Sequence, residues 1–274
     1  MALNIQTNVS SLEAQIRLAS NQRALQSNFN KLASGYRVNT AADDAAGLAI
    51  SESMKSQIRS YAVAERNASD GISMAQTAEG ALGEVHGVLG RMRELAMQAS
   101  NGSLSETDRD YLNTEFGLLK EEITRIQDST TFNGVNLVGE ASSSVTFQVG
   151  LNDDTSDQIT VSFGGLDLSA LDSASIAGAN ADNALSALET IDDAIEDVST
   201  SRSNFGSAMN RLQVATSNIQ TMRLNLSAAN SRIVDVDVAD ETAKMSRNQV
   251  LSQAGVSVLA QANQIPQLAL SLLR

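Results

Sequence analysis

Residues 248–274 read NQVLSQAGVSVLAQANQIPQLALSLLR, and this last stretch of the chain decides its fold. A large aliphatic residue recurs in it every seven residues, and a small residue stands at each alternate position, which gives a spacing of 4, 3, 4, 3. That spacing is typical of a helix that packs along another helix, and the small residues permit close approach. The large residues of this stripe are Leu251, Val258, Ile265 and Leu272, and the small ones are Gly255, Ala262 and Ala269.

The remaining faces of the same stretch carry further leucines, so a helix formed by it would be apolar almost all round. Such a helix needs to be surrounded by other protein, because it is not stable alone in water. The first part of the chain has a stripe with the same spacing, which begins at Ile5. We therefore predict that both ends of the chain are buried, in part by other copies of the same chain. The residues predicted to pack in the core of that assembly are Ile5, Val9, Leu12, Ile16, Leu251, Val258, Ile265 and Leu272.

The composition of the 274-residue chain favours long helices packed side by side over a rounded domain. The chain contains no Trp, no Cys, one Pro and 3% aromatic residues, so its apolar content comes mainly from aliphatic side chains. The absence of Cys excludes disulfide bonds and thiol chemistry. The start of the sequence lacks a basic segment followed by an apolar run, so we expect no cleaved signal peptide. No stretch has the roughly 18 apolar residues that would predict a membrane span.

The charge of the chain is unevenly distributed. The net charge is −13, yet residues 1–40 carry four basic residues against Glu13 alone. The excess of acidic residues therefore lies in the middle of the chain, which we interpret as a solvated body between apolar ends. An acidic body argues against nucleic acid as a partner. Ends that are poor in Lys and Arg are also poor anchors for an anionic membrane, so we expect no membrane partner.

Helical periodicity dominates the sequence on both sides of one short interruption. It predicts a first helix over residues 4–33 and a long helix over residues 45–99. Between them, Gly35 and the polar residues that follow it predict a linker. Ser105 with Asp108 predicts a capping box, and the helix that follows it should end near residue 128.

The periodicity changes after residue 128. Asn133–Gly134 is a turn sequence, and apolar and polar residues then alternate in two runs separated by GLNDDTSDQ. This pattern predicts a β-hairpin at about residues 140–165. A second long helix of about 40 residues follows over 185–226, and RIVDVDVAD separates it from the terminal helix. The alternating apolar residues of the hairpin are Val145, Phe147 and Val149, then Ile159, Val161 and Phe163.

This order of elements predicts a mainly α fold. We expect a long antiparallel helical bundle or rod, with a terminal coiled coil of the N- and C-terminal helices and a small β-hairpin region. The order is nearly a palindrome, which suggests a chain that runs out along a rod and returns.

The residue types that carry chemistry in enzymes are scarce or badly placed. His86 is the only histidine, and without Cys it excludes zinc sites and nucleophilic catalysis by His or Cys. Adjacent carboxylates such as Asp43–Asp44 and Asp192–Asp193 point apart on a helix or turn, which favours capping and solvation over acid–base work. The acidic loop at 153–157 lacks the full set of calcium ligands. We therefore expect no enzyme activity, no cofactor and no metal site.

Five segments of the chain together resemble bacterial flagellin. They are NIQTNVSSLEAQ, LASGYRVNTAADDAAGLAISE, RMRELAMQASNG, TTFNGVNL and MSRNQVLSQAGVSVLAQANQIPQLALSLLR. They are long, follow one another in order and include both ends of the chain, which makes the resemblance specific. It implies a structural, non-enzymatic protein that self-assembles into the flagellar filament and gives swimming motility.

The resemblance also implies how the domains are organised. Residues 1–40 together with 235–274 correspond to the inner core domain, a coiled coil of the two terminal helices that lines the filament channel. Residues 41–234 correspond to an α-helical rod domain that carries the β-hairpin. Between Val138 and Asn183 there is room for the hairpin and little else, so the chain resembles a short form without the outer variable domains.

Several partners follow from the resemblance. Besides other copies of itself, the chain is expected to bind a cytosolic flagellin export chaperone through its C-terminal helix. It is expected to leave the cell through the flagellar type III export apparatus, without a cleaved signal peptide. In the extracellular filament it would meet the filament cap and the hook-junction proteins.

One segment matches the region by which many flagellins are bound by Toll-like receptor 5. Its residues are Leu89, Arg91, Glu94, Leu95 and Gln98, with Glu115 on the neighbouring helix. We interpret Leu89 and Leu95 primarily as contacts to an adjacent subunit. Two other functions stay open from the sequence: a hook–filament junction protein, which shares the terminal coiled coil, and a soluble helical-bundle scaffold protein.

Overall fold

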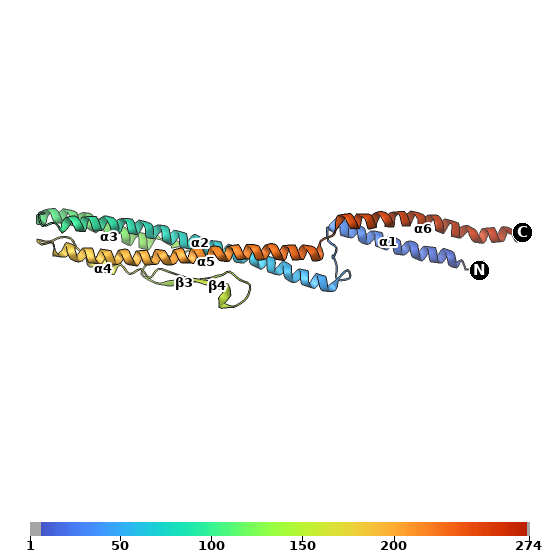
Figure 1. The fold of residues 1–274 in the computed structure, drawn as a ribbon, viewed down its shortest axis with the longest axis horizontal. Coiled ribbons are helices and arrows are strands. Elements are labelled where there is room, and N and C mark those ends of the chain that lie inside the picture. Colours follow the sequence, from blue (N-terminus) through green and yellow to red (C-terminus); the bar gives the residue numbers. More distant parts are fainter. Residues whose placement is uncertain (1–6, 273–274) are drawn as a thin grey trace. The chain divides into compact units, whose positions relative to one another are not determined.

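The computed structural model describes residues 7–272, with side chains for residues 7–264. The chain is mainly α-helical, which confirms the predicted fold class (Figure 1). The helices are α1 (Val9–Ser34), α2 (Ala45–Ala99), α3 (Glu106–Ser129), α4 (Ser169–Ser173), α5 (Asp182–Val234) and α6 (Val238–Leu272), with a 3-10 turn, η1 (Thr155–Asp157). None of the described helices is both long and apolar enough to span a membrane.

The chain divides into two compact units. The terminal unit combines the residues up to Ser56 with those from Asn225 onward, and the central unit is Gln57–Leu224. The two long helices, α2 and α5, each contribute residues to both units. The domain bounds predicted from the sequence lie instead at the linkers beside α1 and α6, and they stay a prediction.

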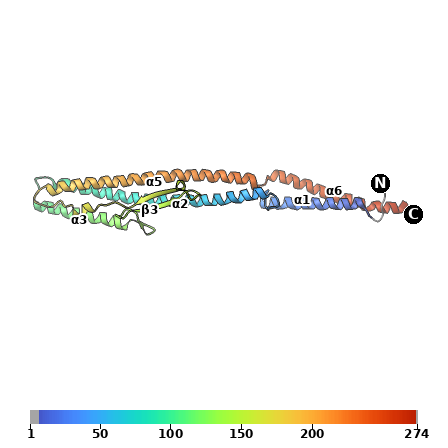
Figure 2. The same ribbon diagram turned by 90° about the horizontal axis from the view of Figure 1, so that it is seen from below.

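In the terminal unit, α1 and α6 run side by side and antiparallel (Figures 1 and 2). α1 ends at Gly35, which has a φ of 73°, a left-handed backbone that glycine adopts without strain. Beyond it, Tyr36 forms an antiparallel β-bridge with Asp235, a residue of the short linker that joins α5 to α6. The predicted linker after α1 is confirmed, and backbone hydrogen bonds tie it to the second linker.

Side chains cap the helices that follow. Asp44 caps α2 by accepting a hydrogen bond from Gly47 N at 2.8 Å. At α3 both halves of the predicted capping box are present: Ser105 Oγ accepts from Asp108 N, and Asp108 Oδ2 accepts from Ser105 N. Hydrogen bonds from the side chain and backbone of Ser105 hold the pKa of Asp108 below its usual value. These caps explain why the predicted starts of α2 and α3 agree with the structure.

In the central unit, α2, α3 and α5 lie alongside one another (Figures 1 and 2). Ion pairs join α2 to α5: Arg93 Nε lies 2.6 Å from Asp192 Oδ1, and Arg202 Nη2 lies 2.6 Å from Glu79 Oε1. As the residue number rises along α2, that of its partner on α5 falls, so these pairs set an antiparallel register. Exposed pairs of this kind contribute little free energy each, and the packed side chains below them supply most of it.

The predicted β-hairpin is confirmed. It consists of β3 (Ser143–Gln148) and β4 (Gln158–Phe163), with Phe147 opposite Ile159 in the antiparallel register. The apolar residues of both strands face the helices, and the facing residue on α2 is Gly71. A Cβ atom there would lie only 3.1 Å from Phe147 and from Leu212, so glycine allows the hairpin and α5 to approach α2 closely.

Three features go beyond the sequence prediction. Asn133–Gly134, with positive φ at both residues, joins two short strands, β1 (Thr131–Phe132) and β2 (Val135–Asn136), so this turn makes a hairpin of its own. The short helix α4 was not predicted. α5 has 53 residues rather than about 40, because it begins before Leu185 and continues past Leu226 to Val234.

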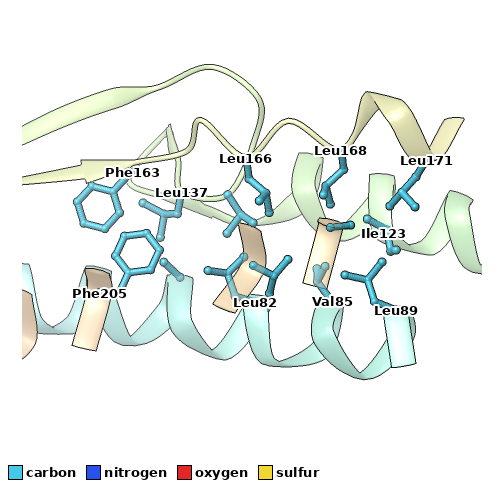
Figure 3. Close-up of a cluster of buried hydrophobic side chains, with 14 of the residues drawn as sticks. Leu82, Val85, Leu89, Ile123, Leu137, Phe163, Leu166, Leu168, Leu171 and Phe205 are labelled. Carbon is cyan, nitrogen blue, oxygen red and sulfur yellow. The ribbon is translucent and has the colours of Figure 1, made fainter. Parts of the chain in front are cut away.

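The core of the central unit lies where the segment around the hairpin crosses the helices (Figure 3). Phe163 at the end of β4 stacks on Phe205 of α5, with ring centroids 5.4 Å apart. Leu82, Val85 and Leu89 of α2 form the opposite wall. Leu137, Leu166, Leu168 and Leu171, from the segments on either side of the hairpin, fill the space above α2 together with Ile123 of α3.

A buried arginine holds one end of the central unit together. Arg109 at the start of α3 is only 3% exposed, and its guanidinium donates to backbone carbonyl groups. The three closest carbonyls belong to Ala99 (2.9 Å), Asn101 (3.1 Å) and Ala179 (3.1 Å). The three belong to the last turn of α2, the loop that follows it, and the segment leading into α5. Arg109 therefore satisfies the carbonyl group of Ala99, which the end of α2 leaves without a helical partner, and two carbonyl groups of the neighbouring loops.

Replacing this arginine tests the role of the cluster. We expect Arg109→Lys to lower the free energy of unfolding of the central unit by about 2–3 kcal/mol, because lysine cannot reach all three carbonyl groups and leaves some buried without partners. Thermal and denaturant unfolding of the full chain measure this loss. The control is Arg125→Lys at an exposed arginine of the same helix. An equal, small change in both variants would contradict the assigned role.

Candidate assembly surface

The contact between α1 and α6 is formed by a seam with the expected spacing but an unexpected composition. On each helix the less exposed residues recur three and four apart. Leu18 and Gly255 lie opposite each other, since a Cβ on Gly255 would be 3.3 Å from Leu18 Cδ1. The seam residues are Ser11, Ala14, Leu18, Asn21, Leu25, Asn28 and Leu32 on α1, and Glu241, Met245, Asn248, Ser252, Gly255, Leu259 and Ala262 on α6.

The apolar stripes selected from the sequence do not face each other in this seam. Of the predicted assembly residues, Val9, Leu12, Ile16, Leu251 and Val258 are all more than half exposed. These positions therefore lie outside the α1–α6 contact, and their packing against other copies of the chain stays a prediction, although Gly255 and Ala262 from the same pattern do lie in the seam. The physical reason is that hydrogen-bonded polar side chains occupy part of the seam. Ile5 lies outside the described residues, and the side chains of Ile265 and Leu272 lie outside the described side chains.

An apolar groove of about 660 Å³ runs along one side of the α1–α6 pair. Glu13 and Arg17 lie at its edge, and they are exposed. The groove thus brings together residues from both helices on the surface of the terminal unit. Its apolar lining consists of Ala14, Leu18 and Ala24 from α1 with Leu251, Ala254, Gly255 and Val258 from α6.

The predicted receptor patch separates into buried and exposed residues. Leu89 and Leu95 are 0% and 1% exposed, in the chain's own core. The interpretation that they contact an adjacent subunit is therefore wrong, because both side chains already pack inside the central unit. The helical spacing alone does not show which neighbour covers an apolar residue.

The charged residues of that patch form an exposed network. Arg91 Nη2 lies 2.8 Å from Glu115 Oε1 on α3, and Arg91 Nη1 lies 2.9 Å from Glu94 Oε2 on α2. The hydrogen bonds to Glu115 and then to Glu94 raise the pKa of Arg91 above its ordinary value. Gln98 is exposed one turn further along α2. The family resemblance correctly predicted that Glu115 lies next to the α2 residues.

The residues considered for chemistry are dispersed. His86 is half-buried on α2, and Asp153 and Asp154 are exposed at the hairpin loop. Among the described side chains, no three His, Cys, Asp or Glu residues lie together in a way that could hold a metal ion.

Comparisons with known proteins identify the family. The model of the bacterial flagellin N-terminal helical region matches residues 5–142, and that of the C-terminal helical region matches residues 188–273. A flagellin of Halalkalibacterium halodurans is 46% identical over 98% of this chain and 99% of that protein. The chain belongs to the bacterial flagellin family. It is the subunit of the extracellular flagellar filament, as the resemblance in the sequence implied, and membership implies self-assembly rather than enzyme activity.

Other relatives agree with this assignment. A flagellin of Bacillus subtilis is 40% identical over 99% of this chain and 100% of that protein. A solved structure from Vibrio parahaemolyticus, described as a flagellar hook-associated protein, has a TM-score of 0.60 at 15% identity, over 70% of this chain and 100% of that one. This second likeness shows a shared fold alone, whereas the full-length matches to flagellins favour a filament subunit over the alternatives left open by the sequence.

The composition of the seam predicts a difference in stability between the two units of flagellin. Three polar residues of the seam are buried where a coiled coil usually places apolar ones, so the pairing of α1 with α6 gains little from apolar burial. In the monomer we expect backbone amides of the terminal unit to exchange with deuterium faster than those of α2 in the central unit. In the filament we expect strong protection of both. Equal protection of α1 in monomer and filament would contradict this prediction.

Proposed function

We propose that the terminal unit provides the inner core of the filament, through the outward stripes of α1 and α6. In this proposal the inner core domain comprises residues 1–40 and 235–274, and residues 41–234 form the rod domain. The observation that supports it is the exposure of large aliphatic side chains on these two helices. They are Val9, Leu12 and Ile16 on α1, and Val250, Leu251, Val256 and Val258 on α6.

The energetic argument compares the two sides of the α1–α6 pair. The large apolar side chains of the seam, such as Leu18, Leu25 and Leu259, are only half-buried. The outward residues are more exposed still, and fully burying one large aliphatic side chain contributes roughly 1.5–3 kcal/mol. Association also has costs in lost freedom, so only part of this gain appears as affinity. Packing against other copies is a means of burial available to a protein that self-assembles.

We propose further that the outward stripe of α6 has a second occupant before assembly. A cytosolic export chaperone would cover Leu251 and Val258, which lie seven residues apart on one face of α6 and are both exposed. The chain would then leave through the flagellar type III export apparatus, and it would meet the filament cap and the hook-junction proteins at the two ends of the filament. These partners come from the family resemblance, and the exposed stripe supports the first of them.

For Toll-like receptor 5 we propose contact through the exposed residues Arg91, Glu94, Gln98 and Glu115. Leu89 and Leu95 support this surface from beneath, because they fix the position of α2 in the core. Charged and polar side chains in a defined network suit recognition by a partner protein, since Arg is frequent in the centre of such interfaces.

Substitution in the outward stripe tests the proposed assembly surface. We expect Val258→Asp to abolish polymerisation, because a carboxylate in an apolar contact would lose its hydration without gaining a partner. Val258→Ile is the matched control and should still polymerise. Sedimentation of polymer and negative-stain microscopy measure the outcome, and thermal unfolding of the central unit should be the same in both variants.

Removal of the residues after Ala254 extends this test. The truncated chain should be a helical monomer whose central unit still unfolds cooperatively, because its core residues lie between Gln57 and Leu224. Filaments formed by the truncated chain, or by Val258→Asp, would show that the outward stripe of α6 is not the subunit contact.

The receptor patch is tested by separating its exposed and buried residues. Arg91→Ala should reduce signalling by the monomer through Toll-like receptor 5, while its thermal unfolding stays close to that of the unchanged chain, because the ion pairs that it breaks are exposed. Leu95→Ala should instead destabilise the central unit by about 2–5 kcal/mol. Arg125→Ala removes a comparable exposed ion pair on α3 and serves as the control. Unchanged signalling by Arg91→Ala would exclude this residue from the receptor contact.

A further inference from the structure

The seam of the terminal unit contains buried polar side chains, and the proposed assembly surface gives no reason for their presence. Asn28 of α1 is 7% exposed and Glu241 of α6 is 5% exposed, at positions where a two-stranded coiled coil normally places apolar residues. Ser11 is buried in the same seam. A polar residue at such a position lowers stability, but it can select one alignment of the two helices, because other alignments leave it without a partner.

Asn28 is the centre of this polar cluster. In the amide orientation that satisfies its neighbours, Asn28 Nδ2 donates to Glu241 Oε1 at 3.1 Å and to Ala24 O at 2.8 Å. Asn28 Oδ1 accepts from Asn248 Nδ2 at 3.2 Å and from Met245 N at 3.1 Å. One side chain of α1 thus contacts three successive seam positions of α6. Glu241 also lies 3.6 Å from the ammonium group of Lys244 on its own helix.

Further polar contacts join the same two helices along their length. Asn21 Nδ2 donates to Asn248 O at 2.8 Å, and Asn8 Nδ2 donates to Ala262 O at 2.8 Å. Near the start of α1, Ser11 Oγ donates to Asn263 Oδ1 at 2.7 Å. Each contact belongs to the same antiparallel alignment.

We propose that this polar seam is a register lock, with Asn28 and Glu241 as its specificity-determining residues. The leucines of α1 cannot select the alignment by themselves, because Leu18, Leu25 and Leu32 repeat every seven residues and look alike after a slip of one heptad. The polar part does distinguish the alignments. A slip in one direction carries Glu241 past the end of α1 at Gly35, and a slip in the other carries Asn28 to the start of α6.

The lock has a consequence for the outward stripes. A slip of seven residues would move Val9, Leu12 and Ile16 along the axis by about 10 Å relative to Leu251 and Val258, at about 1.5 Å per residue. The lock therefore fixes the combined surface that α1 and α6 present. It acts within the single chain, and it stands whether or not that surface is the subunit contact.

Engineered disulfides can measure the alignment directly, because the chain has no Cys of its own. Leu18→Cys with Gly255→Cys reports the observed register. Leu18→Cys with Ala262→Cys reports a slip of seven residues in one direction, and Ala14→Cys with Ser252→Cys reports the opposite slip. The effective concentration of each pair is measured on the full-length monomer in a glutathione redox buffer, with an osmolyte that favours burial. Intermolecular disulfides are separated by their size.

In the otherwise unchanged chain we expect the observed-register pair to exceed both slipped pairs by at least about ten-fold. In Asn28→Leu with Glu241→Leu the helix content should be retained or rise, while the ratio falls to within about two-fold, because the two leucines remove the buried polar groups that the slipped alignments leave without partners. Asn30→Leu with Ser246→Leu adds the same two leucine side chains at exposed positions of the same helices and should leave the ratio unchanged.

Glu241→Gln tests whether the hydrogen bond to Asn28, rather than the negative charge of Glu241, selects the alignment. Its amide oxygen can accept the same hydrogen bond from Asn28, so the ten-fold preference should persist. An unchanged ratio in the double leucine variant at Asn28 and Glu241 would overturn the proposal, and so would equal effective concentrations of all three pairs in the unchanged chain. Loss of preference in the exposed control variant would also overturn it, since the effect would then come from added apolar surface.

Discussion

The antiparallel pairing of α1 with α6 is the constraint on which the terminal unit depends. The two helices approach closely because Gly255 has no side chain to keep Leu18 away. They share a seam in which leucines alternate with asparagine, serine and glutamate. Hydrogen bonds between the helices therefore replace part of the apolar contact in this seam. The side chains best suited to a dry interface are placed on the outside. A single flagellin chain therefore leaves apolar side chains exposed to solvent, as expected of a protein that assembles into a polymer.

The central unit is stabilised in a different way. Its helices bury large aliphatic and aromatic side chains against one another and against the hairpin, and its polar contacts lie mostly at the surface. Gly71 allows the hairpin to sit close to α2, and Arg109 closes one end. The two units thus combine a well-packed body with an end whose pairing is specific but poor in apolar contacts.

Much of this fold could be predicted from the sequence, because local signals marked the ends of its elements. The caps at Asp44 and Ser105 fixed the starts of two helices, and strict alternation identified the hairpin. The seam between α1 and α6 could not be recognised, because Asn21 and Asn28 look like solvent-facing residues in a periodicity argument. The burial of Leu89 and Leu95 depends on which elements cover α2, which spacing does not reveal. Arg109 gave no signal at all, since its acceptors are carbonyl groups that every residue has.

Acid should affect the ion pairs of the central unit and the contacts of Arg109 differently. The ion pairs between α2 and α5 depend on ionised carboxylates, and the hydrogen bond from Arg93 lowers the pKa of Asp192. Stabilisation by that pair is present above the unfolded-state pKa of the aspartate and is lost as the pH falls through its lower folded-state value. The acceptors of Arg109 are carbonyl groups, which do not titrate. Protonation in acid therefore removes ion pairs between α2 and α5, whereas the hydrogen bonds of Arg109 at the end of the unit persist.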